Sequence, residues 1–317
     1  MNELEEAAKT VIEDCMDISE EETVLIVTDD YLFEVGQVLF ELAKTRAKEA
    51  VLTEITIREN DGEEPPAEVS ELMQQFDVIL LPTYKSLSHT QARQKANKAG
   101  ARIASLPEVT MEVMEDTLTV NYHKIKDRSL KLAEKLEQAE TAKVIAPNGT
   151  NIEMSINGRS GHPDTGIYHN SGDFGNLPAG EAYIAPVEGT ATGKFVVDGS
   201  MSGAVVNTEE IELIVEDGYV VDIKGKEAAS DLEKVVNQYG KKAKNIAELG
   251  IGTNDQAKLC GNITVDEKIM GTIHIAIGDN MAFGGKVEVD SHLDGIITNP
   301  TLELDGEIIM EEGNLKL

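Results

Sequence analysis

Residues 23–30 read TVLIVTDD, a run of apolar and β-branched side chains that ends in two aspartates. Such a run is typical of a short strand that is buried on both faces. Helical patterns and apolar runs alternate after it, and the predicted elements are helix 31–49, strand 50–55, helix 66–76, strand 78–81, helix 90–99 and strand 102–106. This alternation indicates a parallel sheet with helices on both faces. We therefore predict an α/β protein that begins with a Rossmann-like domain.

The turn after the first predicted strand argues against nucleotide binding. Residues 29–33 contain no glycine where the backbone could approach a pyrophosphate. Residues 109–140 then show a helical pattern and include a connector helix. We place the end of the first domain at residue 140.

The sequence after residue 140 is rich in predicted strands. Residues 144–156 are typical of a hairpin with Asn148-Gly149 at its turn. Further strands are predicted at 194–198, 210–216, 219–224, 272–277, 295–298 and 301–304, with one helix at 230–244. We expect residues 141–317 to form a β-rich α+β domain.

The composition excludes several classes of partner. The chain has 317 residues, with 58 acidic against 28 basic side chains and a formal net charge of −30. This charge repels phosphate backbones and anionic membrane surfaces, so we expect neither nucleic acid nor membrane as a partner. The acidic start is unlike a signal peptide, and no apolar run approaches the ~18 residues of a membrane span. Since Cys15 and Cys260 suggest no disulfide scaffold, we expect a cytoplasmic protein.

Two histidine segments point to a metal. His292 and Asp294 are two residues apart in a predicted strand, so their side chains lie on the same face. An imidazole beside a carboxylate is a common pair of metal ligands. His274 lies inside another apolar strand, where a hydrogen-bonded core histidine is the simpler interpretation.

Three further segments supply carboxylates. Glu181 follows a Pro/Gly-punctuated turn, Glu248 has small and apolar neighbours, and residues 264–268 contain Asp266 and Glu267. With Asp294, and one carboxylate from each segment, the set has four carboxylates and two imidazoles. A pair of divalent cations about 3.5–4 Å apart needs roughly this number of ligands. Because the set lacks thiolates, soft metals are disfavoured.

These segments resemble the metal-site motifs of the aminopeptidase T / aminopeptidase S family of metalloaminopeptidases. The resemblance rests on residues 176–181, 248–254, 274–278 and 292–294 and extends over nearly the whole chain. It implies a homodimeric metalloprotease, a hydrolase that removes N-terminal residues from peptides with a water activated by two ions of zinc, cobalt or manganese. The implied metal ligands are Glu181, Glu248, Glu267, His274, His292 and Asp294.

The sequence departs from that family at one position. Seven residues after His274 the aminopeptidases carry a tyrosine thought to assist catalysis, and Met281 stands there. A thioether cannot donate a hydrogen bond to an oxyanion. A metal-binding homologue without peptidase activity is therefore one alternative.

The other alternative is an iron-dependent ring-cleaving dioxygenase of the 2,5-dihydroxypyridine type. Those enzymes resemble this chain at His292 and Asp294, but they carry histidine where this chain has Glu248. They also lack counterparts of Glu181 and His274. The residues at these three positions favour the aminopeptidase and two metals.

A second histidine cluster has no assigned role. His162, Asp164, Tyr168 and His169 lie in a glycine-rich setting that is typical of a solvated loop. If the loop is functional, we expect it to act as a lid over the active site.

Overall fold

The computed structural model describes residues 3–204 and 209–317. The chain divides into two compact units, one reaching Lys124 and including Gly166–Ala179, the other formed by Ile125–Thr165 and Gly180–Leu317. The mixed α/β architecture that the sequence predicts is confirmed.

The first unit is built on a parallel sheet. Its strands are β1 (Thr23–Asp29), β2 (Glu49–Ile55), β3 (Val78–Leu81), β4 (Arg102–Ser105) and β8 (Phe174–Asn176), in the order β2-β1-β3-β4-β8. Its helices are α1 (Glu3–Lys9) with a π-helical turn (Thr10–Cys15), α2 (Phe33–Ala43), α3 (Ala67–Met73), α4 (Gln91–Ala99) and α5 (Met111–Leu118). The sequence patterns predicted all of β1 to β4, and the signal is clearest for β1 and β3, which are apolar and buried almost throughout.

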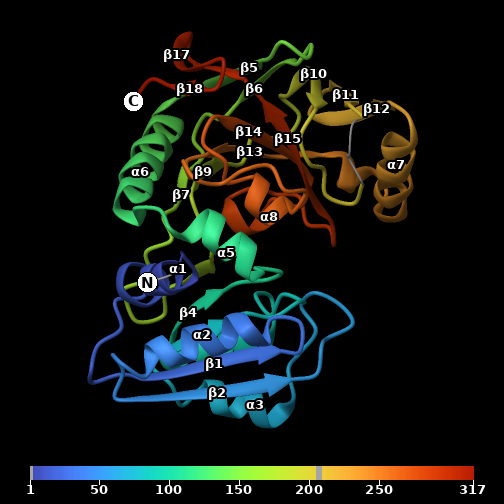
Figure 1. The fold of residues 1–317 in the computed structure, drawn as a ribbon. Helices are drawn as coiled ribbons and strands as arrows, with labels where there is room; N and C mark the ends of the chain where they lie inside the picture. The colour runs from blue at the N-terminus through green and yellow to red at the C-terminus, as the bar shows by residue number, and fades with distance from the viewer. Residues whose placement is uncertain (1–2, 205–208) are drawn as a thin grey trace. The chain divides into compact units, whose positions relative to one another are not determined.

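Helices pack against this sheet through its alternating side chains. Leu25 and Val27 of β1 join Val69 and Met73 of α3 in one apolar cluster, which also contains Ala96 of α4. Helix α2 contacts β1 and β2, as Figure 1 shows. Helix α4 begins after Thr90, whose side chain accepts a hydrogen bond from the Arg93 amide, so a capping residue fixes its first turn.

The second unit contains two antiparallel sheets. An eight-stranded sheet has the order β12-β11-β10-β6-β5-β16-β17-β18, and a five-stranded sheet has the order β15-β14-β13-β9-β7. The strands of the larger sheet are β5 (Thr141–Ile145), β6 (Asn151–Ser155), β10 (Thr192–Val197), β11 (Ile211–Glu216), β12 (Tyr219–Lys224), β16 (Thr301–Leu304), β17 (Glu307–Glu311) and β18 (Asn314–Leu315). Those of the smaller sheet are β7 (His162–Asp164), β9 (Glu181–Ile184), β13 (Ile246–Gly252), β14 (Thr272–Gly278) and β15 (His292–Thr298).

Apolar side chains from both sheets form one core. Phe195 and Leu213 of the larger sheet lie in the same cluster as Leu249 and Ile275 of the smaller one. Helices α6 (Tyr122–Gln138) and α7 (Glu227–Tyr239) add Leu132 and Leu232, among others, to this core. The short helix α8 (Ile263–Asp266) leads into β14. One face of the smaller sheet is therefore apolar, and polar residues are confined to its other face.

The boundary between the two units differs from the predicted one, which lies between residues 140 and 141. The predicted helix 109–140 breaks at Asn121, whose side chain accepts a hydrogen bond from the Lys124 amide and caps α6. Most of α6 belongs to the second unit, because its apolar face joins that unit's core. Conversely, β8 pairs with β4 in the first unit, although it follows six elements further along the chain.

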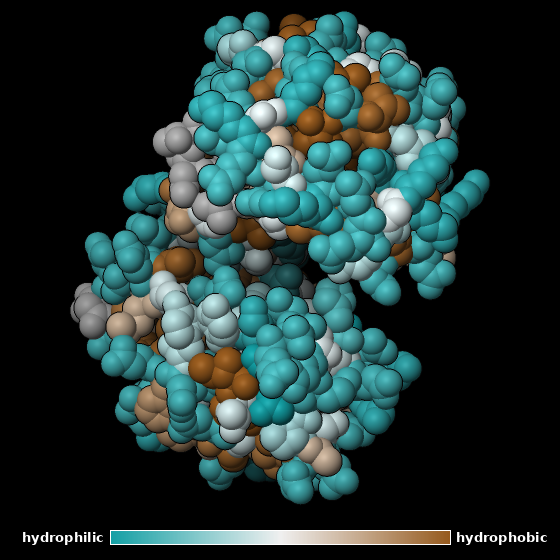
Figure 2. Space-filling view, turned by 90° about the vertical axis from the view of Figure 1, so that its right-hand side faces the viewer, coloured by the Kyte–Doolittle hydropathy of each residue, from teal (hydrophilic) through white to brown (hydrophobic). Residues whose placement is uncertain are grey.

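Within residues 3–204 and 209–317, no helix is both long enough and apolar enough to cross a membrane. Hydrophilic side chains cover most of the face drawn in Figure 2, as the acidic composition leads one to expect.

Candidate metal site

The candidate site lies on the polar face of the five-stranded sheet. In β14, Ile273 and Ile275 point into the core, so His274 between them points to the opposite face. Glu248 of β13 is flanked by core-facing Leu249 in the same way, and Glu181 begins β9. His292 and Asp294 both lie on β15 and share one face of that strand. The two-residue periodicity of the strands thus brings polar residues from four strands together.

Glycines in β13 make room for His274. Gly250 pairs with His274 across the sheet, and a Cβ at Gly250 would lie 1.9 Å from Nε2 of that imidazole. Two residues on, a Cβ at Gly252 would lie 2.0 Å from the carbonyl oxygen of Ile269. Both positions therefore require glycine, since the missing side chain is the space that a neighbour fills.

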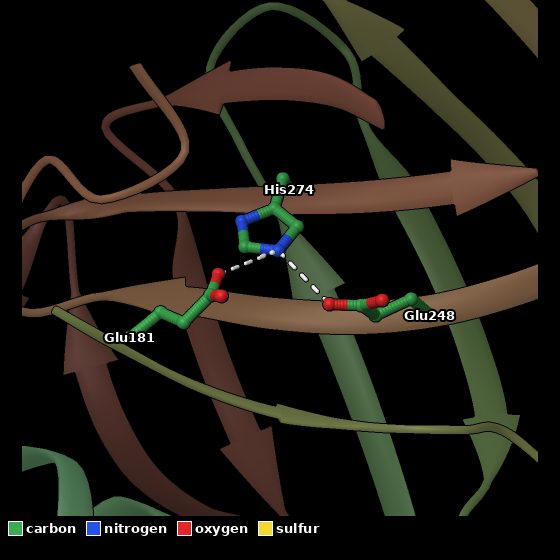
Figure 3. Close-up of side chains that lie close together, drawn as sticks. All are labelled: Glu181, Glu248 and His274. Carbon is green, nitrogen blue, oxygen red and sulfur yellow. Dashed lines mark hydrogen bonds and ion pairs between the residues drawn. The ribbon is translucent and has the colours of Figure 1, made fainter. Parts of the chain in front are cut away.

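His274 lies between two carboxylates, as Figure 3 shows. Its Nε2 is 3.2 Å from Oε2 of Glu181 and 3.3 Å from Oε1 of Glu248, and the residue is 1% exposed. Burial by itself lowers the pKa of His274, but the hydrogen bond to Glu248 and the surrounding negative charges outweigh it and raise the pKa to about 9. Its Nδ1 has no hydrogen-bond partner within the described residues.

His292 has the surroundings that are common for a metal-binding histidine. Its Nε2 lies 3.3 Å from Oε2 of Glu248 and 3.4 Å from Oδ1 of Asp294. Its Nδ1 is 2.8 Å from the backbone carbonyl of Asp279, to which it can donate. A donor bond at one ring nitrogen fixes the tautomer and directs the other nitrogen at a cation. With its side chain 32% exposed, His292 is also the most accessible member of the cluster that it forms with Glu248 and Asp294.

A buried lysine, which the sequence patterns did not predict, also lies in the site. Lys268 is 3% exposed, and its Nζ lies 2.5 Å from Oε1 of Glu181, 2.8 Å from Oε1 of Glu267 and 3.6 Å from Oδ2 of Asp164. Burial raises the pKa of Glu181 to about 8, although the charge of Lys268 opposes this shift. In the sequence, Lys268 follows Asp266-Glu267, and a charged triplet of this kind suggests a solvated surface rather than a buried ion pair.

The six predicted ligands converge in space. Ligand atoms lie within 4.8 Å of one another in three groups, which are Glu181–Glu248–His274, Glu248–His292–Asp294 and Glu267–His274–Asp294. Each pair of groups shares one residue, so the three form a continuous cluster. Nitrogen and oxygen donors of this kind suit first-row divalent metals.

The family model described as "NicX: 2,5-dihydroxypyridine 5,6-dioxygenase" matches residues 3–317. The chain belongs to this dioxygenase family. Its fold is similar to that of 2,5-dihydroxypyridine dioxygenase from Pseudomonas putida, with 20% sequence identity, a TM-score of 0.82 and coverage of 100% of this chain and 98% of that one. No curated protein matches the chain in sequence.

The predicted aminopeptidase family is therefore wrong, and with it the predicted hydrolase and metalloprotease activity. AmpT from Thermus thermophilus is a more distant match, with 15% identity, a TM-score of 0.73 and coverage of 99% of both chains. Since both matched structures resemble this chain over its whole length, the fold itself does not separate them. Glu181, Glu248 and His274 favoured the aminopeptidase, but the family model that matches the full length of the chain is that of the dioxygenase.

Membership of the dioxygenase family implies a metal cofactor, and the three ligand groups are suited to hold one. Met281, which occupies the position of the expected aminopeptidase tyrosine, is 50% exposed in a short 3₁₀ turn (Met281–Phe283). Phe283 is the residue of this turn that reaches the site, with its ring centroid 5.9 Å from that of His292 at an interplanar angle of 89°. Phe283 could not be predicted from the sequence, because one aromatic residue in a glycine-rich loop forms no pattern.

The second histidine cluster was predicted as a loop, and part of it is a strand. His162 and Asp164 lie on β7, paired with Tyr183 and Glu181 of β9. His162 stacks on Tyr183 with ring centroids 5.3 Å apart. His169 instead lies in the first unit, where its Nε2 is 2.8 Å from the carbonyl of Asp14. Asp164 pairs with Glu181 across the sheet, so both side chains lie on the same face. This places Oδ2 of Asp164 3.6 Å from Nζ of Lys268.

Proposed function

We propose that the protein is an iron-dependent dioxygenase that opens a dihydroxylated pyridine-type ring, with the metal held by Glu248, His292 and Asp294. The family match over residues 3–317 is the observation that carries this proposal. The similarity to the Pseudomonas putida dioxygenase supports the same fold. The donor set supports a metal at this place, because its three ligand atoms lie within 4.8 Å of one another.

The ligand group fits a ferrous ion by its chemistry. One imidazole and two carboxylates are nitrogen and oxygen donors of the kind that non-haem iron enzymes use in a facial triad with open positions. Glu248, His292 and Asp294 would be the residues that hold the ion. His292 is partly exposed, so the site can be reached from solvent. Glu248 replaces the second histidine that the resemblance led us to expect in dioxygenases, so this triad has one imidazole and two carboxylates.

When bound, a ferrous ion would supply the redox chemistry that lets a singlet ring react with triplet dioxygen. The protein's own residues orient and enclose the reactants. His292 is fixed by the Asp279 carbonyl, and Glu248 faces both His274 and His292. His274 can hold a proton at Nε2 between Glu181 and Glu248, where it is shielded from water.

Aromatic rings beside His292 suit a planar substrate. Phe283 lies edge-on to His292, and Tyr183 lies edge-on to Phe283 with centroids 5.5 Å apart. His162 extends the series by stacking on Tyr183. Aromatic faces and edges bind planar rings through dispersion and quadrupole interactions. The substrate class that fits is an electron-rich, dihydroxylated heteroaromatic ring.

Oxygen consumption tests this function directly. The protein is loaded anaerobically with Fe²⁺ and mixed with 2,5-dihydroxypyridine, gentisate or catechol, while dissolved oxygen and ring absorbance are recorded. We expect one O₂ consumed for each pyridine ring lost, and none with His292→Ala. His123→Ala, an exposed histidine of α6, is the matched control and keeps wild-type turnover. An iron-loaded protein that consumes no oxygen with any of the three rings would refute the proposal.

A further inference from the structure

Lys268 is a buried cation in the middle of an acidic cluster. The ring-opening reaction proposed above gives it no role. Lys268 follows α8 as the residue after Glu267, and the rest of its side chain is also removed from solvent. Burying an ammonium is costly unless carboxylates pair with it at close range. The carboxylates that pair with Lys268 therefore indicate what it does in the site.

Three carboxylates surround the Lys268 ammonium. Nζ lies 2.5 Å from Glu181 Oε1, 2.8 Å from Glu267 Oε1 and 3.6 Å from Asp164 Oδ2. They reach it from three different segments, namely β9, the end of α8 and the edge strand β7. The ammonium donates a hydrogen bond to Glu181, and the other two carboxylates add ion pairs at longer range.

The pairings divide the cluster into two parts. Glu181 and Glu267 each commit one oxygen to Lys268, whereas Glu248, His292 and Asp294 make no contact with it among the described ion pairs. Sites for two divalent cations need carboxylates that bridge the ions about 3.5–4 Å apart. Here Glu181 and Glu267, which could complete a second cation site, are already paired with the Lys268 ammonium.

We propose that Lys268 is a built-in counter-ion that takes the place of a second divalent metal and restricts the site to one ion. The inference rests on the metal site of the proposed function. The ammonium pairs with one oxygen each of Glu181 and Glu267 and lies 3.6 Å from Asp164, so it balances their negative charge without a second cation. It also repels a further cation from the Glu181 side of the cluster. The single metal is thereby directed to the exposed group of Glu248, His292 and Asp294, where substrate can reach it.

Metal stoichiometry tests the role of Lys268 without any measurement of turnover. Mn²⁺ is the probe, because it is stable in air and a coupled pair has an electron paramagnetic resonance spectrum distinct from the six lines of an isolated ion. We expect one Mn²⁺ per chain for the wild type and two, with exchange coupling, for Lys268→Met. Lys131→Met removes an exposed lysine of α6 and binds one ion. A folded Lys268→Met protein that still binds one uncoupled ion overturns the inference.

Three other variants apply if Lys268→Met does not fold. Lys268→Arg keeps the positive charge and should bind one ion. Asp164→Asn and Glu267→Gln remove carboxylates that the inference assigns to Lys268, so each should bind one Mn²⁺ with an affinity within about threefold of wild type. Loss of the metal in either variant, or two ions in the wild type, overturns the inference. The oxygen-uptake assay is independent of these readings, so the wild type can fail as a dioxygenase while the single-ion result stands.

Discussion

Glu248 and His292 meet at 3.3 Å between Oε2 and Nε2, although their strands are not neighbours. Strand β14 lies between β13 and β15, so the two side chains span the width of one intervening strand. Ala276 of β14 is paired with Glu248 on one side and with Asp294 on the other. Its small side chain lets the carboxylates and the imidazole converge above the sheet.

The convergence predicts that Ala276→Val weakens metal binding. Two added methyl groups would stand between Glu248 and Asp294 on a fully buried position, and overpacking of this kind forces neighbours apart. We expect at least a tenfold loss of Fe²⁺ or Mn²⁺ affinity, measured by titration on protein whose circular dichroism matches wild type. Ile275→Val, on the opposite face of the same strand, should cost about 0.5–1.5 kcal/mol of stability and leave the affinity unchanged. Equal metal affinity in both variants would contradict the role of Ala276.

Gly250→Ala should disturb His274. The new Cβ would lie 1.9 Å from Nε2 of the imidazole, so either the ring or the strand must move. We expect a loss of about 1–3 kcal/mol in the free energy of unfolding, as overpacked cores show. Chemical denaturation of the metal-free protein measures it. An unchanged midpoint would mean that the site tolerates a displaced His274.

An ion pair in the first unit predicts loss of stability in acid. Arg102 of β4 pairs with Glu22, and its guanidinium also donates to the Met16 carbonyl at 2.8 Å. The hydrogen bond from Arg102 holds the pKa of Glu22 below its usual value of 4.5, although partial burial opposes the shift. A carboxyl with a lowered folded-state pKa stabilises the fold above its unfolded pKa, and this contribution is lost as the pH falls through the folded-state pKa.

Wild type should therefore lose more stability than Glu22→Gln when the pH falls from about 5 to about 3. Thermal unfolding at a series of pH values records the difference. Glu20→Gln, an exposed neighbour, is the control and should follow wild type. Parallel curves for Glu22→Gln and wild type would show that the pair does not stabilise the fold.

The net charge of −30 predicts stabilisation by salt. Like charges on the surface repel one another, and ions screen this repulsion over about 10 Å at 0.1 M salt and about 3 Å at 1 M. We expect the melting temperature to rise with KCl concentration. Sucrose at matched osmolarity controls for preferential exclusion, and a melting temperature that falls or stays constant in KCl would contradict the prediction.

Regular patterns in the sequence predicted the fold well where burial is simple. Val78–Leu81 is apolar throughout and was located to the residue. Strand β13 was not predicted, because Glu248, Gly250 and Gly252 interrupt its apolar pattern. The two glycines are explained only by their neighbours in space, since a side chain there would overlap His274 or Ile269. Strand β8 is three residues long and is stabilised by pairing with β4, which is distant in sequence.

The six residues predicted as metal ligands lie together, but the family assigned to them was wrong. Alternation in strands placed His292 and Asp294 on one face, and the structure brings all six predicted ligands together. Lys268 was missed, since nothing in its local sequence indicates burial among three carboxylates. The family was misassigned because the assignment rested on a few short motifs, whereas the dioxygenase family model matches residues 3–317. Homodimer formation stays a prediction.

The most direct test of the proposed function is the fate of oxygen atoms. The iron-loaded protein is incubated with 2,5-dihydroxypyridine under ¹⁸O₂, and the product is analysed by mass spectrometry. A dioxygenase places both labelled atoms in the ring-opened product. A product with both ¹⁸O atoms, absent with His292→Ala, is the predicted result. An intact substrate, or a ring-opened product whose new oxygen atoms come from water, would contradict it.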